Sequence, residues 1–170
     1  MEHNYKNTNK REDLTGEHPA GDIGQIILAC IFIAVWILDT FFIKYSIFLN
    51  EHMSIWVRIP IGIILIIISG YLTLKSHVIV FGKVRETPSV IDKSVFSIVR
   101  HPMYLSELVF YLGLIVISIS LISSVIFCMI FWFLTFIARY EEKLLLKRFG
   151  KDYENYMKKV PLWLPRFRSK

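Results

Sequence analysis

Three long apolar stretches limit what this chain can fold into. Residues 23–42 and 55–74 each have close to the roughly 20 residues needed to cross a hydrocarbon core about 30 Å thick. A third stretch, residues 108–138, runs for 31 residues without a charged side chain. The composition agrees with these stretches, since 54% of the 170 residues are hydrophobic. We therefore expect an all-α integral membrane protein.

The third stretch is too long for one straight crossing. As a single helix it would measure about 46 Å, well beyond the thickness of the hydrocarbon core. Its middle, residues 118–124, reads SISLISS, and serine favours turns and helix caps. We predict a helical hairpin, with one helix from Pro102 to about Ile119 and the next from about Ser123 to Arg139. One long tilted helix is the alternative.

The placement of basic residues predicts the orientation in the membrane. About four transmembrane helices put both ends of the chain on one side, and 18 of the 20 lysines and arginines then lie on that side. Lys44 and Arg58 remain for the other side. By the positive-inside rule, both termini and the central loop are cytoplasmic. Asp39 and Arg58 lie near the outer ends of their spans, where snorkelling to the interface explains them.

The chain divides into three parts on this basis. Residues 1–22 form a polar N-terminal tail, which lacks the features of a secretory signal and which we expect to be disordered at least as far as Gly16. Residues 23–138 form the transmembrane helical domain, and residues 139–170 form a cytoplasmic C-terminal segment with a helical extension. Cys30 and Cys128 lie inside apolar runs, so we expect plain core residues, no disulfide and no metal site.

The first polar cluster is VRHPMYLSE, residues 99–107, at the start of the third apolar stretch. Proline is favoured in the first turn of a helix, so His101 lies at a helix start, where free N–H groups attract an anion. Arg100 adds a permanent positive charge that suits a carboxylate or phosphate. Tyr104 and Glu107 follow on the first turns. The alternative is an interfacial belt in which Arg100 and Tyr104 anchor the helix.

The second cluster follows Arg139, if the last helix continues beyond the bilayer. Gly150 predicts a helix end, and Asp152 is a candidate cap for a short following helix. An amphipathic helix lying on the membrane is the alternative, but it leaves Glu141 and Glu142 facing a negatively charged leaflet, where we expect them to need a cation. One stripe at helical spacing contains Glu142, Leu145, Phe149, Tyr153 and Tyr156.

Together the two clusters carry a family resemblance. RHPMYLSE, followed about 30 residues later by RYEEKLLLKRFGKDYENYMKKVPLWLPR, resembles the isoprenylcysteine carboxyl methyltransferase and phospholipid methyltransferase group. These are small integral membrane enzymes that use S-adenosylmethionine, and both motifs line their cofactor pocket. The resemblance covers residues 75–167. Ser106 departs from it, because the family often has glycine there. The matching residues are Arg100, His101, Pro102 and Tyr104 in the first motif, Glu141 and Glu142 in the second, and Phe149, Gly150, Tyr153, Tyr156, Pro161 and Arg166 in the trailing pattern.

The resemblance implies the following site. Arg100 and His101 would hold the carboxylate of S-adenosylmethionine, Glu141 or Glu142 its ammonium, and Tyr104 would lie against its sulfonium or adenine. If the methyl acceptor is an amine, Glu142 or Glu107 is a candidate base. The candidate catalytic residues are Glu142 and Arg139. The candidate cofactor-binding residues are Arg100, His101, Pro102, Tyr104, Glu141, Glu142, Leu145 and Phe149.

The function implied is methyl transfer from S-adenosylmethionine to a lipophilic substrate that enters from the bilayer. The acceptor would be a carboxyl or an amine on a prenylcysteine-like or phospholipid-like molecule, and nucleic acid is not an expected partner. Two alternatives remain: a sterol-reductase-like membrane enzyme that uses NADPH, and a non-enzymatic membrane scaffold. The sequence leaves the oligomeric state open.

Overall fold

The computed structural model describes residues 21–82 and 89–163, and all regular elements within these ranges are helical. The predicted N-terminal tail up to residue 20 and Arg166 lie outside the described residues. The elements are α1 (Gly21–Ile37), the π-helical η3 (Leu38–Ile43), the 3₁₀ turn η4 (Phe48–His52), α2 (Ile55–Phe81), the 3₁₀ turn η5 (Ser94–Ser97), α3 (Pro102–Ser118), α4 (Leu121–Phe149) and α5 (Lys151–Lys159).

Three of the helical segments are long and apolar enough to cross a membrane. They are Gly21–Ile43, Ile55–Phe81 and Leu121–Phe149, and α3 is a shorter apolar helix. α2 continues to Phe81, beyond the predicted end at residue 74, whereas α4 continues past Arg139 and ends at Phe149, where Gly150 predicted a helix end. For the second span the prediction stopped where charged residues begin, but polar side chains at suitable spacing let a helix continue outside the apolar run.

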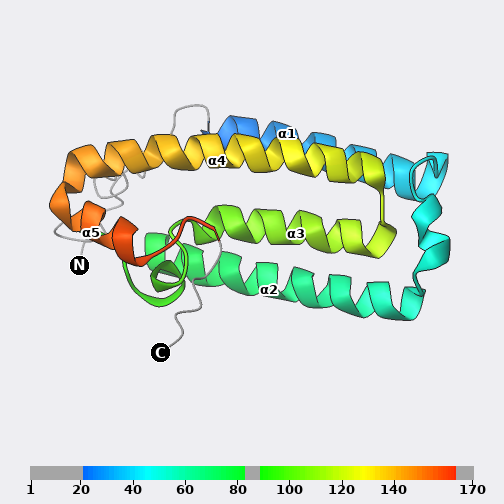
Figure 1. Cartoon of the computed structure of the whole chain (residues 1–170), viewed down its shortest axis with the longest axis horizontal. Coiled ribbons are helices and arrows are strands. Elements are labelled where there is room, and N and C mark those ends of the chain that lie inside the picture. The colour runs from blue at the N-terminus through cyan, green and yellow to red at the C-terminus, as the bar shows by residue number, and fades with distance from the viewer. Residues whose placement is uncertain (1–20, 83–88, 164–170) are drawn as a thin grey trace, which may run out of the picture.

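The four long helices lie side by side, with α3 next to α2 and α4 on the other side of α3 (Figure 1). Ile119 has a left-handed conformation (φ 49°), and Ser120 caps α4 by accepting a hydrogen bond from the Ser123 N–H. The chain therefore turns between α3 and α4, and the alternative of one uninterrupted helix is wrong.

α2 and α3 form the closest helix pair, because small residues face each other across the contact. A Cβ atom on Gly62 would lie 2.9 Å from the carbonyl oxygen of Gly113. Further along, the Ser69 hydroxyl donates to the Ser106 carbonyl over 2.7 Å, and the Thr73 hydroxyl donates to the Ser106 hydroxyl over 2.9 Å. Close backbones joined by hydroxyl groups are typical of helix contacts in membranes. Ser106, the departure from the family pattern, is thus accommodated in this contact.

Asp39 does not reach out to the interface, contrary to the snorkelling prediction. Its side chain is buried and accepts hydrogen bonds from the hydroxyl and backbone N–H of Ser46 and from the Ser120 hydroxyl. Arg58 is also buried, and it donates to the Ile117 carbonyl over 2.8 Å and to Asn50. Ser120, one of the serines that break the third apolar stretch, is thus also a partner of Asp39 from the first.

The outer surfaces of α1, α2 and α4 expose many large apolar side chains, as expected for helices that contact lipid. Cys30 and Cys128 belong to these surfaces and are exposed, so the prediction that they are core residues is wrong. Periodicity around a helix that is apolar on all sides does not show which face packs inward.

Candidate functional site

The first cluster forms the beginning of α3. His101 is the residue before the helix and Pro102 is its first residue, as predicted. Before them, the Arg100 N–H donates to the Pro161 carbonyl over 3.0 Å. The segment that follows α5 therefore holds this part of the chain in place, although 61 positions separate the two residues in the sequence.

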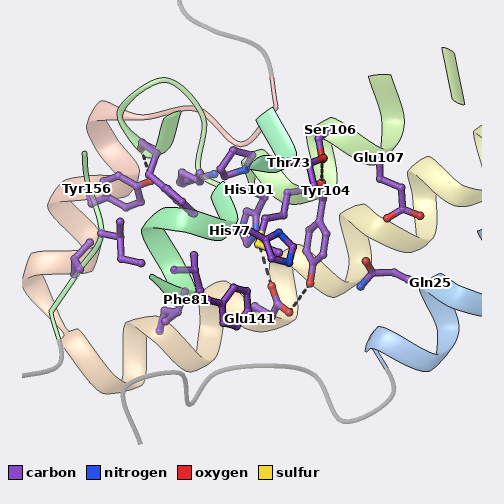
Figure 2. Close-up of a pocket in the computed structure, with 18 of the residues that line it drawn as sticks. Gln25, Thr73, His77, Phe81, His101, Tyr104, Ser106, Glu107, Glu141 and Tyr156 are labelled. Atoms are coloured by element: carbon purple, nitrogen blue, oxygen red, sulfur yellow. Dashed lines mark hydrogen bonds and ion pairs between the residues drawn. The ribbon is translucent and has the colours of Figure 1, made fainter. Parts of the chain in front are cut away.

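The two polar clusters meet at this point. The Tyr104 hydroxyl donates to Glu141 Oε1 over 2.6 Å, and His101 Nδ1 lies 3.6 Å from Glu141 Oε2. The rings of His101 and Tyr104 are parallel, with centroids 5.5 Å apart. Figure 2 shows Glu141 on α4 directed toward both His101 and Tyr104. The predicted convergence of the two clusters is confirmed.

Glu142 lies against the first cluster at a different point. Its Oε1 atom is 2.9 Å from Arg100 Nε and 3.6 Å from His101 Nε2, and the side chains of Arg100 and Glu142 are only 12% and 8% exposed. The Arg100 contact is an ion pair whose angle does not meet that of a hydrogen bond. The cation that the paired glutamates were expected to need is thus supplied, for Glu142, by Arg100 itself.

A cavity of about 930 Å³ lies beside these contacts. Gln25 and Glu107 lie toward one end in Figure 2 and Tyr156 toward the other. Glu142 and Arg139 are not among the residues that line it, since Glu142 is buried behind Arg100 and Arg139 is exposed on α4. The remaining predicted site residues all line it, namely Arg100, His101, Pro102, Tyr104, Glu141, Leu145 and Phe149.

The prediction missed the wall that α2 contributes. Ser69, Thr73 and His77 line the cavity at intervals of four residues, together with Phe81. This spacing places polar side chains on one face of an otherwise apolar helix, so the signal was present in the sequence. Ending the second span at residue 74 removed His77 and Phe81 from consideration.

α5 closes the cavity at the end where Tyr156 lies (Figure 2). Tyr153 and Tyr156 are buried and line it, and the Tyr156 hydroxyl donates to the Phe96 carbonyl over 2.6 Å. Burial raises the pKa of both phenols well above the usual 10.0. The apolar face of α5 thus packs on the protein, which contradicts the alternative of a helix lying on the membrane. The N-cap of α5 is Gly150 and not Asp152, which was the predicted cap.

The comparison with known proteins assigns the family. The family model described as phospholipid methyltransferase matches residues 57–152, more than half of the chain. The chain belongs to the phospholipid methyltransferase family. The matched residues include α3, the glutamate pair on α4 and the α2 wall of the cavity. The part that carries the family signal therefore encloses most of the cavity, and Asp22, Gln25, Tyr153 and Tyr156 line it from outside the matched range.

Curated relatives point to the same group. The chain is 31% identical over 91 residues to a protein-S-isoprenylcysteine O-methyltransferase of Schizosaccharomyces pombe, covering 53% of this chain and 38% of the relative. It is 30% identical over 127 residues to protein-S-isoprenylcysteine O-methyltransferase B of Arabidopsis thaliana, covering 69% and 62%. A probable protein-S-isoprenylcysteine O-methyltransferase of Oryza sativa subsp. indica is 29% identical over 125 residues, covering 68% and 65%.

The aligned part of this chain thus spans between 38% and 65% of the length of these relatives. No solved structure matches the chain significantly. The family assignment consequently rests on sequence, while the arrangement of the site rests on the contacts described above.

Proposed function

We propose that this protein is a membrane methyltransferase that transfers a methyl group from S-adenosylmethionine to a lipophilic substrate. The observation that carries the proposal is the contact of Tyr104 and His101 with Glu141 on the wall of one cavity. The names of the relatives, which describe O-methylation of isoprenylcysteine, support the same reaction class.

The residues present fit S-adenosylmethionine. A cavity of about 930 Å³ falls within the usual range of small-molecule sites, about 300–1,000 Å³. The amino-acid end of the ligand has a carboxylate and an ammonium, and its sulfonium is a further cation, while the cavity wall offers a guanidinium, a carboxylate and several aromatic rings. A zwitterion would find a partner for each charge without leaving either one buried alone.

We assign the roles as follows. Arg100 and the start of α3 hold the carboxylate, because the arginine is permanently charged and the first N–H groups of the helix have no partner within it. Glu141 holds the ammonium, and Tyr104 lies against the sulfonium, where an aromatic ring attracts a cation. Glu142 acts through Arg100, which it holds in place. Pro102, Leu145 and Phe149 complete the pocket surface.

The reaction needs positioning more than proton transfer. When bound, S-adenosylmethionine supplies an electrophilic methyl group on a sulfonium centre. The contacts of α3, α4 and α5 fix Tyr104 and Glu141 relative to one another before a ligand arrives. This preorganisation lets the protein hold an acceptor atom in line with the methyl carbon, which is where such enzymes gain most of their rate.

We further propose four membrane crossings, with α3 as the fourth crossing helix beside the three longer ones. Both termini, α5 and the end of the cavity where Tyr156 lies would then be cytoplasmic, on the side with most basic residues. Residues 139–170 would complete the cofactor pocket. The substrate would enter between the helices from the lipid, and the acceptor would be a carboxyl or an amine.

The direct experiment incubates membranes containing the protein with S-adenosylmethionine labelled at the methyl group, then extracts the lipids. We expect label in a lipid product with the wild-type protein and little or none with His101→Ala. Equal labelling by both proteins would contradict the assigned site. Labelling no higher than in membranes without the protein would contradict the function.

Two further measurements address the alternatives. A reductase would bind NADPH in preference to S-adenosylhomocysteine when the purified protein is titrated with each. A scaffold would show no rise in melting temperature with either ligand, whereas a ligand that binds the folded state must raise it. The proposal predicts a rise with S-adenosylhomocysteine and none with NADPH.

A further inference from the structure

One face of α4 is exposed over most of the helix, and it changes from apolar to basic where the third apolar stretch ends. Its exposed apolar residues are Val125, Met129, Trp132 and Phe136. Its exposed basic residues are Arg139, Lys143 and Lys147. At about 100° per residue, all these positions fall within a sector of about 80° around the helix axis. This sector, the outer face of α4, therefore presents an apolar strip that continues directly into a basic strip.

Both acidic residues of α4 point away from the outer face. The carboxylates of Glu141 and Glu142 each lie 3.6 Å from His101, on the side of α4 that faces the beginning of α3. In the described part of the chain, the basic residues of the outer face take part in no ion pair. Their positive charge is therefore available to a partner outside the protein, and charge complementarity requires that partner to be anionic.

The junction of the two strips lies at the depth of lipid headgroups. In the proposed orientation Phe136 belongs to the crossing part of α4, and Figure 1 shows α4 continuing past the beginning of α3. Arg139 and Lys143 lie about 4.5 and 10.5 Å further along the helix axis than Phe136. The headgroup layer is about 5–7 Å thick on each side of the hydrocarbon core. Lipid tails on the apolar strip would thus bring a phosphate within reach of Arg139 and Lys143, whose long side chains can bend toward the interface.

We propose that the outer face of α4 binds an anionic phospholipid, with its tails on the apolar strip and its phosphate at Arg139 and Lys143. Lys147, one turn further along, adds attraction to the net negative charge. A zwitterionic lipid carries an ammonium that balances its phosphate and repels these cations, so it binds more weakly. A soluble acidic protein would use the basic strip and leave the adjoining apolar strip without a partner, so the two strips together favour a lipid.

The site is separate from the cavity, and the lipid is held there as a ligand and not as a methyl acceptor. The residues of the outer face are not among those that line the cavity. Arg139 thereby receives a role in lipid binding in place of the predicted catalytic role. The inference goes beyond the proposed methyl transfer, and it succeeds or fails independently of that function.

The test compares two lipids with the same tails. Dioleoylphosphatidylglycerol is anionic, and dioleoylphosphatidylcholine is zwitterionic. Native mass spectrometry counts the lipid molecules that stay bound as each lipid is titrated into the full chain in detergent. A base near a charged membrane surface strengthens the attraction about fivefold, so we expect phosphatidylglycerol to bind the wild type at least about tenfold more tightly. This preference should decrease as the salt concentration rises.

The matched variants remove the same number of charges from two places. Lys143→Gln with Lys147→Gln leaves only Arg139 on the basic strip, and we expect the preference for phosphatidylglycerol to fall to about threefold or less. Lys93→Gln with Lys159→Gln removes two exposed lysines outside α4 and should leave the preference unchanged. Lys143→Arg with Lys147→Arg keeps both charges and should retain the preference. Lys143→Gln alone serves if the first double variant does not fold.

The outcomes decide whether the outer face of α4 is the site. Equal binding of the two lipids to the wild type would overturn the proposal and leave an acidic protein as the partner of the basic strip. A preference that survives in the α4 double variant would overturn it as well. An equal loss in both double variants would show that overall charge attracts the lipid, which contradicts a site on α4. A loss confined to the α4 variant would support the proposal.

Discussion

The Tyr104 hydroxyl donates a hydrogen bond to Glu141 Oε1 over 2.6 Å, across 37 positions of sequence. The bond joins the first turn of α3 to the C-terminal half of α4. Because its acceptor is a carboxylate, it belongs to the stronger class of hydrogen bonds. It also fixes the position of the carboxylate that we assign to the ammonium of the methyl donor.

Tyr104→Phe tests this positioning. The variant keeps the aromatic ring and removes the hydroxyl that orients Glu141, and hydrogen bonds to charged groups contribute about 1.5–3 kcal/mol. We expect the affinity for S-adenosylhomocysteine, measured by calorimetry, to fall about tenfold. Tyr45→Phe is the control, since Tyr45 lies between η3 and η4 and is exposed. Equal affinities in both variants would contradict the role of the hydroxyl.

Glu142→Ala tests the buried ion pair with Arg100. Removing the carboxylate leaves a nearly buried guanidinium without its partner, which typically costs about 3–5 kcal/mol. The control is Glu154→Ala, because Glu154 pairs with Lys158 on the exposed surface of α5. Such a pair contributes about 0.5 kcal/mol or less. Unfolding in detergent micelles measures the loss of stability in each variant. Similar losses in the two variants would contradict the expectation that the buried Arg100 pair contributes more than the exposed one.

Gly62→Leu tests the close approach of α2 and α3. Any side chain at this position meets the Gly113 carbonyl and Ile117, so the helices must separate. We expect a loss of about 1–3 kcal/mol in the free energy of unfolding. Gly70→Ala on the same helix is the control, because nothing lies within 4 Å of the added Cβ, and alanine favours helix by about 0.5–1 kcal/mol. An unchanged free energy of unfolding in Gly62→Leu would contradict this packing.

The buried phenols of α5 predict a loss of stability at alkaline pH. Their pKa values are raised above 10.0 in the folded state, so folding favours the protonated phenol. That contribution is complete below the unfolded pKa of about 10 and is lost as pH rises through the folded pKa. Thermal unfolding from neutral pH upward should show a smaller alkaline fall for Tyr156→Phe than for the wild type. Parallel pH profiles for the two proteins would be inconsistent with this account.

The sequence predicted those parts of the structure that local patterns determine. Pro102 marked the start of α3, the serines around residue 120 marked the turn before α4, and Gly150 marked the end of α4. Each is a helix terminus, where a particular residue type satisfies the free backbone groups. The family motifs then indicated which two segments meet.

The rest depended on which faces of the helices pack together. Asp39 was expected at the interface, but Ser46 and Ser120 supply its hydrogen bonds inside the bundle. Glu142 was expected in the pocket, yet it lies behind Arg100 and leaves Glu141 as the lining residue. Adjacent residues on a helix point about 100° apart, so the motif alone does not show which glutamate faces the cavity.

The central claim is that one cavity wall, with Glu141 at its centre, binds a sulfonium nucleoside, and a titration tests it most directly. Full-length protein in lipid nanodiscs is titrated with S-adenosylhomocysteine by calorimetry, for the wild type and for Glu141→Ala. The account predicts saturable binding to the wild type at one site per chain, and binding at least about tenfold weaker in Glu141→Ala. Absence of binding to the wild type, or equal affinity in both proteins, would contradict it.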